Sequence, residues 1–586
     1  MVREPHHDKK KSFRLITMDI NLKIKNEIAS LLKKHGLKIK PQDLREPPQA
    51  EMGDISLPCF ILSKEMKKSP EKIAEDLAKV IKPSGFIINI KNIGSYLNFL
   101  LDYAKVTEMI LTEIKKERSD YGLNKTGSGQ KVMIEYSQPN THKEFHIGHV
   151  RNICLGSALV NLYQASGYKV IAANYLGDIG AHVAKVLWYM LNYVNEADIG
   201  PDKGEFLGQA YSRAIVELNS DPEKQVQVQE ILQRLEAGKD RDLMFLWKQT
   251  RDWSLDAFNE IYDELGIKFN VDFFESIEEK EGRKLLPMLL KQDFIKESQG
   301  AIIADLEEYK LGVLVLLRGD GTSLYGLKDI PLAIKKFKKY KIDKSLYIVD
   351  NRQSQYLKQI FKILELLGFK KDMLHVPYEF VELKSGIISS RTGNVVTYEE
   401  VRDAAMTKVV NETKIRHVDW SEEKINEVSK KIVLAALKFG MIKQASDKII
   451  TFDIEEALKI DGFTGPYLLY TNARLNSILK KAETEGIKLT GKTDYKALES
   501  NIEKQLIKDL LAYPQIVLEA QIKNDPAILA QFIHRVCQNF NTFYHELPVM
   551  KAESEIRLAR IILIKATKQV LENSLAVLGM PILKEM

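Results

Sequence analysis

Apolar residues with helical spacing alternate with short apolar runs in the first 125 residues of the chain. The segment "SPEKIAEDLAKVIK" opens with a Ser-Pro pair, which favours a helix start, and its apolar residues Ile73, Leu77 and Ile81 lie four positions apart. The next segment, "GFIINIKNIGSYLNFLLD", is typical of two short strands on either side of Gly94. The polar, glycine-rich stretch "GLNKTGSGQ" (Gly122–Gln130) then indicates a domain boundary. We therefore expect a compact α+β unit over residues 1–125.

A strand–helix–strand pattern follows this boundary. The run "KVMIEYS" (Lys131–Ser137) predicts a short strand, and "HVRNICLGSALVNLYQAS" has the apolar spacing of a helix that ends at Gly167. The segment "KVIAANYLGD" predicts a second strand. A strand–helix–strand unit joins parallel strands through a right-handed crossover, so we predict an α/β domain with a parallel sheet.

Helical and strand patterns alternate once more in the second half of the chain. Residues from about 190 to 300 are helical and charged in pattern, and strand-like runs then return as "LGVLVLLRGD", "SLYIVD" and "HVPYEFVEL". A helical segment between two halves of a parallel sheet indicates an insertion. From about residue 400 helical patterns dominate, for example in "YLLYTNARLNSILKKA" and "PAILAQFIHRVCQNFNTFYHEL".

The composition is that of a protein with a large core. A length of 586 residues suggests about three to five domains, and 45% hydrophobic with 28% charged residues is ordinary for a globular chain. The net charge of +6 permits a nucleic-acid partner without indicating one, because a basic patch must be local to matter. Cys59, Cys154 and Cys537 are far apart and show no Cys-x-x-Cys spacing, which argues against structural zinc and a disulfide framework. We therefore expect a protein of the reducing cytoplasm.

Neither a membrane span nor a secretory signal is apparent. No apolar run approaches the ~20 residues that a membrane-spanning helix needs, so we expect no membrane partner. The N-terminal stretch "MVREPHHDKKKSFRLITMD" is basic but lacks the apolar core of a secretory signal. A transit peptide remains an alternative, against which the acidic residues Glu4, Asp8 and Asp19 argue.

Three histidines are concentrated in the loop "SQPNTHKEFHIGHVRN" (Ser137–Asn152), between the first predicted strand and the helix after it. Ligands of open parallel sheets bind at the carboxyl ends of strands, and the N–H groups at a helix start favour anions. His146 and His149 flank Gly148, which lets a ligand approach the backbone, so we interpret the loop as a triphosphate site. Surface histidines and a metal-binding pair are the alternatives, but no third ligand of metal type lies nearby. We expect His142 to face solvent. We expect Cys154, which lies one helical turn beyond His146 and His149, to be buried.

The string "EYSQPNTHKEFHIGHVRN" resembles the first signature of the class I aminoacyl-tRNA synthetases, in the version found in arginyl-tRNA synthetases. "ANYLGDIG" (Ala173–Gly180) resembles the family segment that follows, with Ile179 where the family usually has Trp. The resemblance covers nearly the whole chain. It implies a Rossmann-type parallel catalytic sheet with a helical insertion, an N-terminal α+β domain and a C-terminal all-helical domain. The corresponding boundaries are 1–125 for an additional tRNA-binding domain, 126–405 for the catalytic domain with its insertion near 190–300, 406–454 for a helical connector, and 455–586 for a helical anticodon-binding domain.

The resemblance also implies a reaction, in which L-arginine is activated by ATP with Mg²⁺ and transferred to tRNA(Arg). A carboxylate is already a nucleophile, so the catalytic task is to position it and to neutralise charge, for which His146, Gly148 and His149 are candidates. We expect no metal ligands among the protein side chains. An arginine pocket needs carboxylates, because a guanidinium has five donors and a permanent charge. The family residues that hold arginine correspond to Glu135, Asn140, Tyr325, Asp329 and Gln353.

These candidates also have plainer interpretations. Asp329 alone would be read as the N-cap of a helix that begins with "IPLAIKKFKKY", and Tyr325 and Gln353 alone would be ordinary residues. Glu135 is harder to explain in that way, because a carboxylate in a buried strand needs a partner. By the resemblance, Asp329 pairs with the guanidinium, Glu135 is a second acidic partner, and Asn140 holds the amino or carboxylate end.

A second family signature binds the phosphates through a Lys-Met-Ser-Lys-Ser-like loop, and "GIISSRTGNVV" (Gly386–Val396) corresponds to it. Its candidate phosphate contacts are Ser389, Ser390, Arg391 and Gly393. Thr392 stands where many relatives carry a lysine, and in relatives of this kind a lysine of the first signature takes that part. Lys143 occupies the corresponding place, so we hypothesise that it supplies the missing charge. The alternative is that Lys143 is a solvated loop residue.

Thr392 also leaves two rival functions open. One is a synthetase-derived tRNA-binding or regulatory protein with weak or no ligase activity. The family residues His146, His149, Asn140 and Asp329, which are intact, argue against it. The other is a cysteinyl or glutaminyl enzyme, which the acidic candidates and the lack of cysteine-type zinc ligands disfavour. We expect the chain to act as a monomer.

The two ends of the chain resemble tRNA-binding domains of the same family. "YTNARLNSIL" (Tyr470–Leu479) partly matches the string that is typical of the anticodon-binding domain. Tyr513, Phe540 and Tyr544 are candidates for stacking on unpaired anticodon bases, with helix packing as the alternative at this helical spacing.

Overall fold

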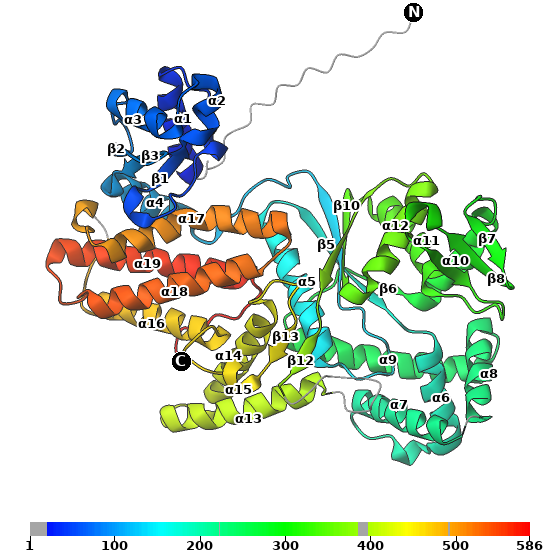
Figure 1. The fold of residues 1–586 in the computed structure, drawn as a ribbon. Coiled ribbons are helices and arrows are strands. Elements are labelled where there is room, and N and C mark those ends of the chain that lie inside the picture. The colour runs from blue at the N-terminus through cyan, green and yellow to red at the C-terminus, as the bar shows by residue number, and fades with distance from the viewer. Residues whose placement is uncertain (1–19, 222, 385–395, 490–492) are drawn as a thin grey trace, which may run out of the picture. The chain divides into compact units, whose positions relative to one another are not determined.

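A computed structural model describes residues 20–221, 223–384, 396–489 and 493–586 (Figure 1). The chain forms two compact units. One comprises Met1–Tyr121, Ile478–Gln515 and Gln538–Val570; the other comprises Gly122–Ser477, Ile516–Cys537 and Leu571–Met586. Within the described ranges, no helix has both the length and the apolar character to cross a membrane.

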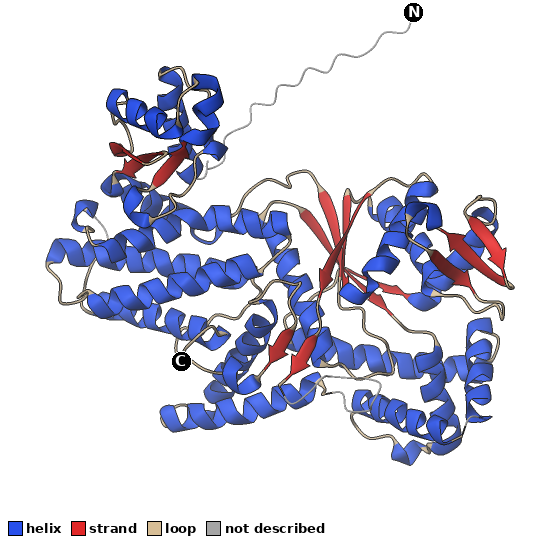
Figure 2. Cartoon of the chain, viewed as in Figure 1, coloured by secondary structure: helices blue, strands red, loops and turns tan. Residues whose placement is uncertain are grey.

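The centre of the second unit is a parallel sheet of five strands in the order β11-β10-β4-β5-β6. Figure 2 shows the strands of the chain in red. Its strands are β4 (Lys131–Glu135), β5 (Lys169–Leu176), β6 (Val271–Phe274), β10 (Lys344–Asp350) and β11 (Asp372–Tyr378). The middle strand β4 is covered on both faces, which explains why its apolar run does not alternate with polar residues. The predicted parallel strand–helix–strand unit is therefore confirmed, whereas the edge strand β6 was not predicted.

Helix α5 (Ile147–Ala165) connects β4 to β5 and is buried on nearly all sides. It ends where Gly167 adopts a φ of +82°, as expected for a helix stop. A Cβ atom on Gly156 would lie 2.2 Å from the ring of Tyr136, so the glycine lets the helix approach the segment after β4 closely. In Figure 1, α5 lies on one face of the sheet, and α11 and α12 lie on the other. Cys154 is buried in α5, as predicted.

Four helices follow β5 and enclose a core of their own. Trp188, Trp247 and Ile179 belong to this apolar cluster, so Ile179 is a core residue in this chain. The helices are α6 (Ala181–Tyr193), α7 (Lys203–Ser220), α8 (Glu223–Ala237) and α9 (Arg241–Glu264).

A small antiparallel sheet of three strands precedes the second half of the parallel sheet. It comprises β7 (Ile295–Ser298), β8 (Ala301–Asp305) and β9 (Val313–Leu317), in that order. The run "LGVLVLL" forms β9, so its assignment to the second half of the parallel sheet was wrong. The physical reason is that an apolar run fixes burial but not the partner strand, and β9 packs on one face only, with Val313 44% exposed. Three helices complete this region: α10 (Glu275–Leu289), α11 (Tyr325–Tyr340) and α12 (Ser354–Leu366).

The N-terminal part of the first unit is an α+β structure, with an antiparallel sheet in the order β1-β3-β2. The predicted Ser-Pro helix start is confirmed, because the Ser69 side chain accepts a hydrogen bond from the N–H of Lys72. The two strands predicted around Gly94 are confirmed as well. The elements are α1 (Ile20–Lys34), β1 (Ile55–Pro58), α2 (Ser63–Met66), α3 (Pro70–Val80), β2 (Ile87–Ile93), β3 (Tyr96–Leu101) and α4 (Tyr103–Glu117).

The rest of the chain is mainly helical, as the sequence predicts. Tyr513 and Phe540 are buried, which favours packing over base stacking for both, while Tyr544 is 38% exposed. Strand β12 (Val381–Leu383) pairs in parallel with β13 (Ile450–Phe452). The helices are α13 (Tyr398–Arg416), α14 (Glu422–Ile442), α15 (Ile454–Ala457), α16 (Gly465–Thr484), α17 (Asn501–Lys523), α18 (Ala527–Glu546) and α19 (Ser554–Val577).

Candidate active site

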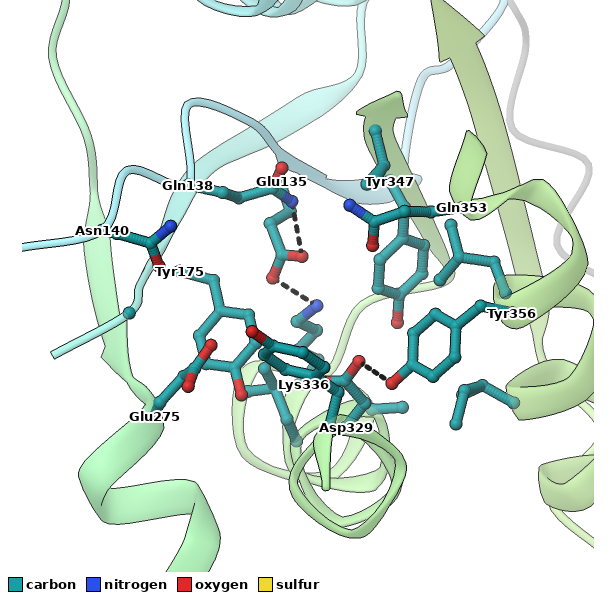
Figure 3. Close-up of a pocket in the computed structure, with 17 residues that line it drawn as sticks. Glu135, Gln138, Asn140, Tyr175, Glu275, Asp329, Lys336, Tyr347, Gln353 and Tyr356 are labelled. Carbon is teal, nitrogen blue, oxygen red and sulfur yellow. Dashed lines mark hydrogen bonds and ion pairs between the residues drawn. The ribbon is translucent and has the colours of Figure 1, made fainter. Parts of the chain in front are cut away.

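A cavity of about 410 Å³ opens at the carboxyl ends of β4, β5 and β10, where open parallel sheets bind their ligands (Figure 3). All five residues that the sequence predicts for arginine binding line it, namely Glu135, Asn140, Tyr325, Asp329 and Gln353. The structure thus brings them together, and their roles remain predictions. The other lining residues are Gln138, Tyr175, Gly177, Glu275, Leu332, Ala333, Lys336, Tyr347, Val349, Tyr356, Leu357 and Ile360.

Glu135, the last residue of β4, is held by two side chains. Its Oε2 lies 2.6 Å from the ammonium of Lys336, and its Oε1 accepts a hydrogen bond of 3.1 Å from the amide of Gln138. The Lys336 side chain is 0% exposed, and its ammonium lies 4.1 Å from the ring centroid of Tyr347. Burial by itself would lower the pKa of Lys336, but Glu135, Tyr347 and Asp329 together outweigh it, and the net effect is a raised pKa. Lys336 is therefore a buried cation, which the sequence did not predict.

Asp329 has a very different environment. It lies in the second turn of α11, which begins at Tyr325, so the interpretation of Asp329 as a helix N-cap was wrong. Its Oδ2 accepts a hydrogen bond from the hydroxyl of Tyr356, whereas its buried Oδ1 has no hydrogen-bond partner among the described residues. Burial raises the pKa of Asp329 to about 7, although the Tyr356 hydroxyl opposes this shift. The hydroxyls of Tyr175 and Tyr347 are likewise buried without a partner in the described ranges. Buried polar atoms without a partner are uncommon in folded proteins, and these three lie on residues that line one cavity.

The cavity carries an excess of negative charge. Glu275, which follows β6, lines the cavity beside Glu135 and Asp329, and it lies 3.0 Å from the ammonium of Lys328. Two lysines thus balance two of the three carboxylates, and one negative charge remains when Asp329 is ionised. Such a cavity suits a ligand group with a single positive charge. Over the part of the chain that the structure describes, no three or more His, Cys, Asp or Glu side chains are grouped as metal ligands would be.

The rim of the cavity contains the other predicted residues. Asn140 forms a parallel bridge with Gly177, the residue after β5. A Cβ atom on Gly177 would lie 2.2 Å from Oδ1 of Asn140, so only glycine leaves room for this amide. Tyr325 is 61% exposed, and Gln353 is exposed as well, so both are accessible to a ligand that enters.

His146 and His149 form a stacked pair at the start of α5, with ring centroids 3.8 Å apart. Nδ1 of His146 accepts the N–H of Gly148 at 3.1 Å, and Nδ1 of His149 accepts the N–H of His146 at 3.2 Å. Burial, together with the charge of Lys143, lowers the pKa of His146 to about 4, and burial lowers that of His149 well below its usual value. Both rings are therefore neutral at pH 7, with the proton on Nε2 as a hydrogen-bond donor for phosphate oxygens.

Gly148 and Lys143 complete the first signature. A Cβ atom on Gly148 would lie 2.9 Å from the ring of His146, so a side chain there would displace the imidazole. The ammonium of Lys143 lies 4.8 Å from the ring centroid of Tyr211 in α7. Its charge contributes to the lowered pKa of both His146 and His149, which indicates that it acts on the site that they form.

His142 is buried, so the expectation that it faces solvent was wrong. Its ring nitrogens lie 2.9 Å from the hydroxyl of Thr141 and 2.8 Å from that of Thr250, and its N–H donates to Ser254. Burial lowers the pKa of the ring to about 3. The physical reason is that α9, which the sequence did not place beside this loop, supplies two hydroxyl partners for it. His142 therefore attaches the loop to α9.

The second signature, with Ser389, Ser390, Arg391, Thr392 and Gly393, lies outside the described residues. Described residues just after it contact the first signature. Thr397 forms an antiparallel bridge with His146, and the N–H of Tyr398 donates to the carbonyl of Phe145 at 2.8 Å. The chain thus returns to the histidines directly after the second signature.

The sequence did not indicate six of the eleven polar or charged side chains that line the cavity. Lys336 follows Asp329 by seven positions, so helical periodicity could have placed both on one face of α11. Tyr356 follows the predicted Gln353 by three positions, which is the same kind of signal. Glu275 depends on β6, which no pattern indicated.

Three family models match the chain and together cover most of it. One described as "tRNA synthetases class I (R), catalytic domain" matches residues 110–453, which is more than half of the chain. One described as "Arginyl tRNA synthetase N terminal domain" matches residues 19–101, and one described as "DALR anticodon binding domain" matches residues 468–586.

Individual proteins are similar over nearly their full length. The arginine–tRNA ligase of Bdellovibrio bacteriovorus is 37% identical over 552 residues, which are 92% of this chain and 93% of that protein. That of Clostridioides difficile is 35% identical, over 91% and 94% of the two chains. The solved structure of the Thermus thermophilus arginyl-tRNA synthetase superposes with a TM-score of 0.79 at 27% identity, over 96% of this chain and 99% of that one. The α/β architecture with a parallel sheet, the cavity at its carboxyl edge and these matches agree: the chain belongs to the arginyl-tRNA synthetases, in class I of the aminoacyl-tRNA synthetases.

Proposed function

We propose that this arginine–tRNA ligase binds the side chain of L-arginine in the cavity at the end of β4, with the guanidinium on Oδ1 of Asp329. The observation that carries this proposal is that Oδ1 is buried without a partner among the described residues, beside two partnerless tyrosine hydroxyls. A guanidinium offers five donors in one plane and keeps its charge at any physiological pH. It would satisfy these atoms and cancel the remaining negative charge. The exposed Tyr325 and Gln353 would close around the entering side chain.

The main-chain end of the amino acid would then lie towards Asn140 and the histidines of α5. An oxygen of its carboxylate attacks the α-phosphorus of ATP, the bond to the β-phosphate oxygen breaks, and pyrophosphate leaves. His146 and His149 donate hydrogen bonds from Nε2 to phosphate oxygens, and the N-terminus of α5 adds its N–H groups. The 2′- or 3′-hydroxyl of the terminal ribose of tRNA(Arg) then attacks the arginyl carbonyl, and AMP leaves. Mg²⁺ enters with the phosphates of ATP as part of that substrate.

Lys143 is part of the proposed phosphate site, together with Ser389, Ser390, Arg391 and Gly393 of the second signature. It would supply the charge that Thr392 lacks. The support for this role is its contribution to the low pKa of both histidines. We expect Lys143→Ala to slow adenylate formation about tenfold or more, as loss of a charge that stabilises the transition state does. Lys203→Ala is a matched control, because Lys203 also lies over an aromatic ring, that of Trp253 at 5.0 Å. An unchanged rate in Lys143→Ala would refute the role.

The same proposal includes the partners and the organisation of the chain. We propose that residues 1–125 and 455–586 bind tRNA(Arg), that 406–454 connect the latter to the catalytic domain, and that the enzyme acts as a monomer. The cytoplasm is its proposed location, since all three cysteines are free thiols.

The test is charging of total tRNA with each of the twenty labelled amino acids in turn. We expect L-arginine alone to be incorporated by the wild-type enzyme, and Asp329→Asn to lose this activity selectively through KM for arginine. Incorporation of another amino acid, or an unchanged KM for arginine in Asp329→Asn, would contradict the proposal. Adenylate formation should be measured with tRNA present, because relatives of this type need it.

A further inference from the structure

We propose that Lys336 is a specificity-determining residue. Glu135 must neutralise the positive charge of the Lys336 ammonium, so that the cavity accepts one guanidinium group on Asp329. The inference rests on the proposed function, that L-arginine binds in this cavity. In this inference the main role of Glu135 is to neutralise Lys336, and contact with the substrate is secondary.

The geometry of Figure 3 carries this inference. Lys336 extends from α11 into the cavity, where its ammonium lies 2.6 Å from Oε2 of Glu135 and above the ring of Tyr347. Both side chains of the ion pair are buried, with exposed fractions of 0% and 4%. The other oxygen of Glu135 accepts the amide of Gln138. Glu135 is therefore occupied by groups of the protein before any substrate enters.

Asp329 lies on the same face of α11 and is not occupied in this way. Its Oδ1 is free of hydrogen bonds to the described residues, and its Oδ2 is bonded to Tyr356. A guanidinium that reaches Asp329 comes close to the resident ammonium of Lys336, because both residues line one cavity. Two unscreened cations in a cavity of low dielectric repel each other strongly. Binding of arginine thus depends on the negative charge of Glu135, even if Glu135 never contacts the substrate.

Four proteins test this dependence: the wild type, Glu135→Gln, Lys336→Met and the double variant, each in tRNA charging at pH 7.5. In Glu135→Gln the ammonium loses its partner and competes with the substrate for Asp329, so KM for arginine should rise about 100-fold. The double variant removes this ammonium as well, so KM should fall back by about tenfold or more relative to Glu135→Gln. KM for ATP should change less than about twofold throughout, because the phosphate site is separate.

The opposite result decides against the inference. If Glu135 acts mainly by direct contact with the guanidinium, the double variant will be no better than Glu135→Gln. An unchanged KM in Glu135→Gln overturns the inference as well. In Lys336→Arg, which keeps the charge, KM for arginine should stay within about fivefold of the wild-type value. In Lys336→Met, KM for arginine should differ from the wild-type value by more than that.

A neighbouring ion pair provides the matched control. Lys335 precedes Lys336 on α11 and pairs with the buried Glu278, but neither residue lines the cavity. The double variant Glu278→Gln/Lys335→Met removes the same two charges at the same helix and should leave KM for arginine unchanged. If the proposed function itself is wrong, Asp329→Asn will also leave this KM unchanged. If only the role of Lys336 is wrong, Asp329→Asn and Glu135→Gln will raise it, without recovery in the double variant.

A pH profile keeps the inference testable if Glu135→Gln does not fold. Lys336 lowers the pKa of Asp329 and Glu135 raises it. The acid limb of kcat/KM for arginine should therefore move to higher pH in Lys336→Met, and back towards the wild-type position in the double variant. An acid limb that does not move in Lys336→Met contradicts the inference. The groups that face Asp329 are Glu135 from β4, Tyr175 from β5, Tyr347 from β10, Glu275 from α10, Lys336 and Tyr325 from α11, and Tyr356 from α12.

Discussion

Replacing Asp329 by asparagine should weaken arginine binding and, at the same time, stabilise the enzyme without substrate. Asparagine keeps the shape of the side chain but removes its charge. Each hydrogen bond from the guanidinium to the carboxylate is worth about 1.5–3 kcal/mol, so the loss of one such bond raises KM for arginine about 10- to 200-fold. KM for ATP should not change, because His146 and His149 are intact.

The stability of Asp329→Asn follows from the pKa of the buried carboxyl. Folding raises this pKa from 3.8 to about 7. The protonated Asp329 carboxyl contributes to the free energy of unfolding, and this contribution is complete below pH 3.8 and is lost as the pH rises to about 7. Above pH 7 the folded protein contains an ionised carboxylate that is buried. This difference in pKa corresponds to about 4 kcal/mol at most, and water in the cavity reduces it to about 1–3 kcal/mol. An asparagine side chain at this position avoids the cost.

Urea unfolding without arginine, at pH 8 and at pH 5, measures the effect. We expect Asp329→Asn to be more stable than the wild type at pH 8, and the gain to be smaller at pH 5, where the folded wild type is already protonated. Equal stability of the two proteins at pH 8, or a gain that grows towards pH 5, would refute the assignment of a raised pKa. A stable variant with unchanged arginine KM would refute the assignment of the site.

Three further changes test other parts of the site. Gly148→Ala should displace the His146 ring, since a Cβ atom would lie 2.9 Å from it, and should lower kcat about 10- to 100-fold; Gly200→Ala, where the added atom meets nothing within 4 Å, should not. His142→Ala should lower the free energy of unfolding by about 2–4 kcal/mol, because it removes two buried hydrogen bonds and leaves a cavity; a loss below about 0.5 kcal/mol would argue against the buried position. Tyr356→Phe removes the hydroxyl that favours the ionised aspartate of the cavity, so the acid limb of kcat/KM for arginine should move to higher pH; a fixed limb would show that another group titrates.

The sequence predicted the elements whose signals are local. The Ser-Pro start of α3, the strands around Gly94 and the unit from β4 through α5 to β5 were all predicted, because caps, turns and periodicity act over a few residues. Strand β9 was assigned to the wrong sheet and β6 was not predicted. Strand pairing is decided by contacts between distant segments, and four residues such as Val271–Phe274 carry too little pattern to indicate a strand.

The candidate site shows the same division. The five residues that line the cavity and were predicted, among them Glu135 and Asp329, came from resemblance to a family, which carries tertiary information that periodicity lacks. Lys336 lies among four other lysines in "IKKFKKYK", and composition favours a solvated helix face for all of them. The structure separates Lys336 from its neighbours because Glu135, some 200 positions earlier, faces it. A pattern that spans a few residues gives no information about a partner so far away along the chain.

The most direct test of the central claim is a structure of the enzyme with L-arginine bound. We predict that guanidinium nitrogens lie within about 3.2 Å of Oδ1 of Asp329, with the carboxylate of arginine towards Asn140. The ion pair of Glu135 and Lys336 should persist in that complex. Arginine bound outside this cavity, or with its guanidinium on Glu135 and Lys336 displaced, would contradict the account.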